Sequence, residues 1–197
     1  AFNKSHATCY SWVAYQTAYM KAHYPAEYMA ALMTRRFSQI TEITKLMEEC
    51  KALKIATLGP DVNESQIGFG VNKHGEIRFG LSAIKGMGAS AADSIVRERM
   101  ENGPYKDIYD FAERVDLSNV NRKAFESLAY SGGFDSFGIA RESYFGTDSK
   151  GSTFIDNLTR YGQLFQMEQQ QMRNSLFGDS NAVEVATPPV PQAERWS

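Results

Sequence analysis

The sequence predicts a mainly α-helical protein: a helical subdomain, one small β-hairpin, a tandem helix-hairpin-helix and an extended C-terminal tail. Two observations carry this prediction. Apolar residues recur at helical spacing through most of the chain, whereas convincing alternation is confined to residues 69–81. In addition, Gly86-Met87-Gly88 is followed by Ala92 and Ile95, which is the spacing of a helix-hairpin-helix, a compact unit that grips a nucleic-acid backbone.

The N-terminal region is expected to form three helices that pack as one layer. The first runs over about 10–22, and Pro25 suits the first turn of the second. Thr41 is the expected N-cap of the third helix, whose apolar residues follow the helical period. The inward residues expected on the second and third helices are Tyr28, Met29, Leu32, Met33, Ile43, Leu46, Met47, Cys50 and Leu53.

The segment between this layer and the glycine motif is expected to hold one β-hairpin. Residues 58–63 contain Gly59 and Pro60 and break the helical pattern, which is typical of a fixed loop. Beyond them, apolar residues alternate on both sides of a polar turn at 72–75. The hairpin leads directly into the motif at residue 84.

The Gly86-Met87-Gly88 turn has the chemistry of a phosphate-binding hairpin. Both glycines let the backbone approach a ligand without a Cβ in the way. We expect Met87 to point inward, and the next helix offers free N–H groups at the positive end of its dipole. We therefore expect Lys85, the amides of the three motif residues and Ser90 to bind DNA without sequence preference. The alternative is an ordinary tight turn between packed helices.

A second, degenerate unit is expected over residues 117–138, without a Gly-hydrophobic-Gly turn. One helix begins after Asp107, and another begins near Asn121 and ends at 132–133. Arg122 and Lys123 stand at the start of the later helix and are weaker candidates for DNA contact. For these two residues, a solvated helix face is the alternative interpretation.

The C-terminal part is expected to hold a polar loop at 148–152, one amphipathic helix and an extended linker. A proline-rich stretch at 188–191 marks the linker, and the tail from about residue 179 is expected to be mobile. The apolar positions of the helix are Phe154, Leu158, Tyr161, Leu164 and Phe165.

The composition indicates a globular chain with no overall basic field. Of its 197 residues 43% are hydrophobic and 22% are charged, and the formal net charge is −2, so that any contact with nucleic acid must be local. Cys9 and Cys50 form neither a disulfide framework nor a zinc site and are expected to be buried thiols in a reducing compartment. No membrane-spanning run or signal peptide is found, which favours a cytoplasmic piece of a longer protein without a membrane partner.

Several stretches together resemble one known family. Residues 2–7, 22–31, 60–63, 80–88 and 133–138 read FNKSHA, AHYPAEYMAA, PDVN, GLSAIKGMG and GFDSFG. In this order they are similar to the bacterial DNA polymerase III alpha subunits, the C-family replicative polymerases, over roughly residues 2–178. The resemblance implies an end of the fingers domain at 1–80, a tandem helix-hairpin-helix module at 81–145, a connecting helix with a possible clamp-binding peptide at 146–178, and a flexible linker at 179–197.

The resemblance also implies a function in template-directed DNA synthesis. The parent protein would be a DNA-directed DNA polymerase, a nucleotidyltransferase that uses Mg²⁺ at palm residues outside this chain. The chain itself contains no Asp-x-Asp pair, and His6, His23 and His74 lack metal-ligand spacing. We therefore expect a non-catalytic fragment with no catalytic residue, no metal site and no cofactor, apart from a possible monovalent cation at the hairpin. The expected partners are primer-template duplex DNA, incoming nucleotide, the sliding clamp and other replicase subunits.

Further contacts are implied at the two ends of the chain. Asn3, Lys4, Ser5 and His6 would face the incoming nucleotide, with a polar helix-capping segment as the alternative. Near the C-terminus, Ser175, Leu176 and Phe177 resemble the end of a clamp-binding peptide, in which Arg173 replaces the usual first glutamine. Packing of Phe177 back onto the protein is the alternative.

Two other functions fit parts of the sequence. A free-standing helix-hairpin-helix adaptor of repair or recombination would share the hairpins but would have no use for the fingers-like residues 2–63. A structural or protein-interaction module would use the hairpin only as a turn, and a test of DNA binding separates it from the other two.

Overall fold

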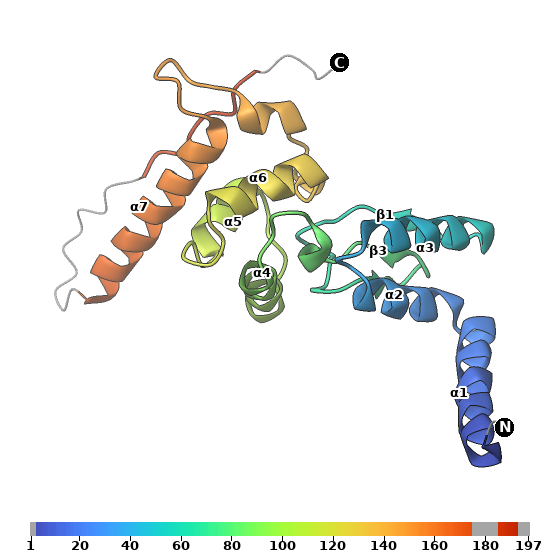
Figure 1. Ribbon diagram of the computed structural model, residues 1–197. Coiled ribbons are helices and arrows are strands. Elements are labelled where there is room, and N and C mark those ends of the chain that lie inside the picture. The colour runs from blue at the N-terminus through green and yellow to red at the C-terminus, as the bar shows by residue number, and fades with distance from the viewer. Residues whose placement is uncertain (1–2, 175–184, 193–197) are drawn as a thin grey trace.

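The computed structural model describes residues 3–174 and 185–192 and confirms a mainly α-helical fold (Figure 1). Short 3-10 turns at Leu81–Ala83, Asp135–Phe137 and Arg141–Phe145 link the main elements. In chain order these are α1 (Lys4–His23), α2 (Pro25–Arg35), α3 (Ile40–Ala52), β1 (Thr57–Leu58), β2 (Gly70–Val71), β3 (Ile77–Arg78), α4 (Ala89–Asn102), α5 (Ile108–Arg114), α6 (Arg122–Ser131) and α7 (Phe154–Asn174).

The helices α2 and α3 pack on a small sheet and enclose the first buried cluster. Met29 and Met33 of α2 and Cys50 of α3 are fully buried there, as their helical spacing predicts. The predicted hairpin is confirmed, because β2 and β3 pair antiparallel. The strand β1, which runs parallel to β3, was not predicted: Leu58, assigned to a loop, lies in this strand.

The helix α1 contradicts the prediction of one three-helix layer. It has no buried residue and stands apart from the rest of the protein, with only its C-terminal end beside α2 (Figure 1). Trp12, Tyr15 and Tyr19 form a row of rings along one face of α1, but they are exposed because no other described element covers that face. Cys9 lies on α1 and is exposed, which corrects the prediction that both cysteines are buried.

The ends of two predicted helices also differ from expectation. The first helix begins at Lys4, well before residue 10, because the side chain of Asn3 accepts a hydrogen bond from the Ser5 amide and caps it. The third helix begins after Gln39, so that Thr41 lies inside it and is not the N-cap. Leu53 follows the end of α3 and is 42% exposed rather than inward.

The second and larger buried cluster joins α4, α5, α6 and α7. Its centre is aromatic: Phe111, Phe125 and Phe134 are at most 1% exposed and meet edge to face or tilted. The loop at 58–63 is fixed against this cluster, because the side-chain amide of Asn63 exchanges two hydrogen bonds of 2.8 Å with the backbone of Tyr105. We call this half of the molecule, residues 81–174, the hairpin module.

The C-terminal segments pack along the hairpin module. The helix α7 follows the predicted apolar positions and continues to Asn174 through the glutamine-rich stretch, although Leu164 is 47% exposed. Residues 185–192, assigned to a mobile linker, are extended and contact the module, where the Tyr109 hydroxyl donates to the Pro188 carbonyl at 2.8 Å. The predicted domain boundaries stay a prediction.

Candidate nucleic-acid interface

The first hairpin is a compact turn in front of α4. The element before the glycine turn is the 3-10 turn Leu81–Ala83, which is shorter than the first helix of a full helix-hairpin-helix. The amide of Met87 donates to the Ile84 carbonyl at 3.0 Å, and Gly86 has a φ of +89°, a conformation that favours glycine. The helix α4 then begins at Ala89.

The apolar side chains of this hairpin fix it to the buried cluster of the hairpin module. Met87 and Ile84 are buried, and Ala92 and Ile95 on the next helix are fully buried in the same cluster. The spacing of Met87, Ala92 and Ile95 therefore predicted their burial correctly. Because these side chains hold the turn from the inside, its polar backbone faces outward.

The outer face of the hairpin is open. Lys85 and Ser90 are exposed, and neither side chain contacts an acidic partner among the described residues. Gly88 is the N-cap of α4 and supplies no side-chain hydrogen bond, so the first amides of the helix have no capping side chain. A Cβ at Gly88 would meet only the Ser90 hydroxyl, at 3.8 Å, which shows how open the approach is.

Two residues of α6, Lys123 and Ser127, lie close to the first hairpin. A Cβ placed on Gly86 would lie 3.4 Å from Lys123 Cε and 2.8 Å from Ser127 Oγ. The structure thus places Lys123 beside Lys85 and the glycine turn, rather than at a separate second site. Ser127 was not predicted; its position one turn after Lys123 on the same helix face is the only signal for it in the sequence.

The second hairpin, between α5 and α6, is closed by its own side chains. Asp116 accepts hydrogen bonds from Ser118 Oγ at 2.6 Å and from Asn119 Nδ2 at 2.6 Å, which lower the pKa of this carboxyl and keep it anionic. Asn121 caps α6 by accepting from the Ala124 amide. A side chain therefore caps the N-terminal amides of α6, whereas no side chain caps those of α4.

Arg122 is directed away from the first hairpin and is neutralised. Its guanidinium lies 2.6 Å from the Asp156 carboxylate of α7 and 2.9 Å from Glu126. The hydrogen bond that Arg122 donates to Asp156 is the main cause that raises the pKa of Arg122. Of the two basic residues predicted at the start of α6, the structure brings only Lys123 to the glycine turn.

The predicted nucleotide-facing residues lie at the free end of α1. Asn3 Oδ1 accepts from the Ser5 amide and hydroxyl, which is the capping arrangement weighed as the alternative. Lys4 is exposed, and the ring of His6 lies 4.4 Å from that of Tyr10. Figure 1 shows this end of the chain far from the hairpin module. The predicted clamp-binding residues Ser175, Leu176 and Phe177 lie outside the described residues.

Within residues 3–174 and 185–192, no three His, Cys, Asp or Glu side chains are grouped closely enough to hold a metal ion. No helix in this part of the chain has the length and apolar character needed to span a membrane.

Comparisons with known proteins point to one family. Residues 54–144 match the family described as the helix-hairpin-helix motif. The DNA polymerase III alpha subunit of Pasteurella multocida is 44% identical over 140 residues, which cover 71% of this chain and 12% of the relative. The corresponding subunit of Chlamydia trachomatis is 48% identical over 136 residues, 69% of this chain and 11% of the relative.

A third relative covers nearly the whole chain. The DNA polymerase III alpha subunit of Xylella fastidiosa is 34% identical over 196 residues, which cover 99% of this chain and 16% of the relative. The chain therefore spans between 11% and 16% of the length of these three relatives.

Proposed function

The chain belongs to the DNA polymerase III alpha-subunit family, and we propose that it acts there as a non-catalytic segment that holds the backbone of primer-template duplex DNA. The observation that carries this proposal is the open first hairpin. The amides at the start of α4 have no capping side chain, Lys85 next to the turn is exposed, and Lys123 lies close to Gly86. A free-standing repair adaptor is disfavoured, because the three relatives named above are polymerase subunits and one of them aligns with 99% of this chain, including residues before the hairpins.

The electrostatics of the first hairpin suit a phosphate. Helix N-termini attract anions through free N–H groups and the positive end of the helix dipole. Lys85 and Lys123 add positive charge at this hairpin. Because the net charge of the chain is −2, the attraction for a phosphate is local to this surface. Contacts of this kind fix the position of the duplex without reading its sequence.

Three finer parts of the proposal concern the longer protein. The free end of α1 would offer Lys4 to the triphosphate of an incoming nucleotide, which is supported by the absence of any acidic residue in the first turn of α1. Ser175, Leu176 and Phe177 would bind the sliding clamp, and a monovalent cation would sit between the hairpin carbonyls and a phosphate. Synthesis itself would need Mg²⁺ at residues of the longer protein outside this chain.

Fluorescence anisotropy of a labelled primer-template duplex tests the main proposal. We expect weak binding that Lys85→Ala and Gly88→Val each reduce by about five- to tenfold, because one removes a charge and the other blocks the approach to the amides. Lys150→Ala removes the same charge from a distant exposed loop and should change the affinity by less than about twofold. Equal losses in all three variants, or binding that survives the first two, would contradict the proposal.

A further inference from the structure

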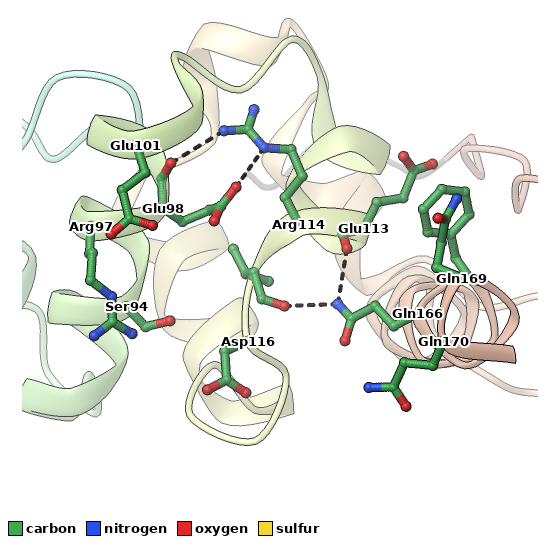
Figure 2. A pocket seen from close by; sticks show the side chains of 12 residues that line it. Ser94, Arg97, Glu98, Glu101, Glu113, Arg114, Asp116, Gln166, Gln169 and Gln170 are labelled. Atoms are coloured by element: carbon green, nitrogen blue, oxygen red, sulfur yellow. Dashed lines mark hydrogen bonds and ion pairs between the residues drawn. The ribbon is translucent and has the colours of Figure 1, made fainter. Parts of the chain in front are cut away.

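A polar groove on the hairpin module is not used by the proposed function. It lies between α4 and α7, with the end of α5 as its floor, and has a volume of about 580 Å³ (Figure 2). This volume falls within the range of ligand-binding clefts, about 300–1,000 Å³. We call it the α4–α7 groove.

The groove carries an excess of negative charge. Its lining contains the four carboxylates of Glu98, Glu101, Glu113 and Asp116 and the two guanidiniums of Arg97 and Arg114, which gives a net charge of −2. Such a surface repels the phosphates of nucleic acid and attracts cations.

The excess is not neutralised by the cations already present. Arg114 is occupied, because it pairs with Glu98 at 3.0 Å (Figure 2). It also pairs with Asp110, which lies outside the groove, at 2.9 Å. Glu101 and Arg97 lie on the exposed face of α4, and neither forms an ion pair among the described residues. The groove therefore retains carboxylate charge that a cationic ligand could satisfy.

The Ser94 hydroxyl, which opens onto the groove, also points to a ligand. Ser94 is only 4% exposed, lines the groove, and makes no hydrogen bond to any described residue. Its hydroxyl faces the open space of the groove, opposite the amide side chains of Gln169 and Gln170 on α7 (Figure 2). This hydroxyl can donate and accept a hydrogen bond, and no group of the described residues uses it, so it is available to a ligand in the groove.

We propose that the α4–α7 groove binds an extended, lysine- or arginine-bearing peptide segment of a protein partner. The carboxylates of α4 and α5 would receive the cationic side chains, while Ser94 and the two glutamines would bond to the peptide backbone. A metal ion is the less suitable occupant, because the carboxylates are not grouped as ligands in the described chain. This function is independent of DNA binding at the first hairpin.

Anisotropy of a short fluorescein-labelled peptide, with lysine and arginine alternating with glycine, tests the proposal. We expect Glu101→Lys to weaken binding of this peptide by about tenfold, because it reverses a charge at the groove. Glu48→Lys makes the same change on the exposed face of α3 and should alter binding by less than about twofold. Thermal unfolding of both variants, which we expect to match the parent, verifies that each is folded.

A second variant and a competitor separate a peptide site from a general charge effect. Ser94→Ala leaves the charge unchanged and should weaken peptide binding by about two- to fivefold through the lost hydrogen bond. Spermine, a polycation without a peptide backbone, should displace the peptide poorly. Equal losses in Glu101→Lys and Glu48→Lys, unchanged binding in Ser94→Ala, efficient displacement by spermine, or no measurable peptide binding would each overturn the proposal.

Discussion

The two hairpins of the module resemble each other in sequence layout but differ in what their surfaces leave available. Each places a turn before a helix, and each has basic residues near that turn. At the first hairpin, Gly88 leaves the start of α4 uncapped and Lys85 has no acidic partner among the described residues. At the second, Asn121 caps α6 and Arg122 is paired with Asp156.

This difference shows that a basic residue at a helix start is not sufficient evidence of a phosphate site. The amides and the charge must also remain free in the folded protein. The second hairpin uses its polar groups to stabilise its own turn and its contact with α7, and contributes Lys123 and Ser127 of α6 to the surface of the first. The tandem module therefore presents one open basic surface at the glycine turn, built from both units.

The largest effect on stability is expected at the glycine turn of the first hairpin. Gly86→Ala should lower the free energy of unfolding by about 1–2 kcal/mol, because its φ of +89° is strained for any residue with a Cβ. The nearby Ser127 hydroxyl, 2.8 Å from the added Cβ, can rotate away and should add little.

Urea denaturation measures this effect, and Gly88→Ala provides the control. Gly88 has an ordinary φ of −77° and open space around it, so its replacement should change stability by less than about 0.5 kcal/mol. If both substitutions destabilise the protein equally, the two glycines do not have the separate roles assigned here.

A somewhat smaller effect is expected at the cap of the second hairpin. Asn121→Ala should cost about 1 kcal/mol in the free energy of unfolding, because the Ala124 amide loses its capping partner. Asn121→Asp keeps an accepting oxygen and should retain most of the stability. Urea denaturation of the two variants checks this, and an alanine variant as stable as the parent would show that the cap is not used.

The smallest effect is expected from the ion pair that holds Arg122. Burial acts to raise the pKa of Asp156, but hydrogen bonds from Arg122 and Thr153 outweigh it and leave the pKa below its usual value. A lowered pKa in the folded state means that the stabilisation is present above the unfolded pKa, about 3.9, and is lost as the pH falls through the folded value.

A pH series of unfolding measurements tests this linkage. The stability difference between the parent and Arg122→Ala should shrink as the pH falls from about 5 to about 3, because protonation of Asp156 removes the pair in the parent as well. A difference that stays constant over this range would show that the ion pair contributes nothing.

Local features were the ones that the sequence could predict. The cap at Asp107, the helix start near Asn121, the helix end at Gly132 and the inward Met87 depend on neighbouring residues, and all four are found in the structure. The same holds for the β2–β3 hairpin, whose strands are separated by one short turn.

Contacts between distant residues could not be predicted in the same way. Lys123 meets the first hairpin across 37 positions of sequence, and Arg122 pairs with Asp156 across 34, so neither partner is visible in a local pattern. The isolation of α1 also escaped prediction, because a row of aromatic residues on one helix face looks the same in the sequence whether or not another element covers it. The groove between α4 and α7 exists only through tertiary packing.

The salt dependence of duplex binding tests the central claim most directly. We would compare the slope of log Kd against log salt for the parent, Lys85→Ala with Lys123→Ala, and Arg122→Ala. If the first hairpin with Lys123 forms the phosphate-binding surface, the double variant should lose about two units of slope, and Arg122→Ala should leave the slope unchanged. An unchanged slope in the double variant, or an equal loss in Arg122→Ala, would contradict the account.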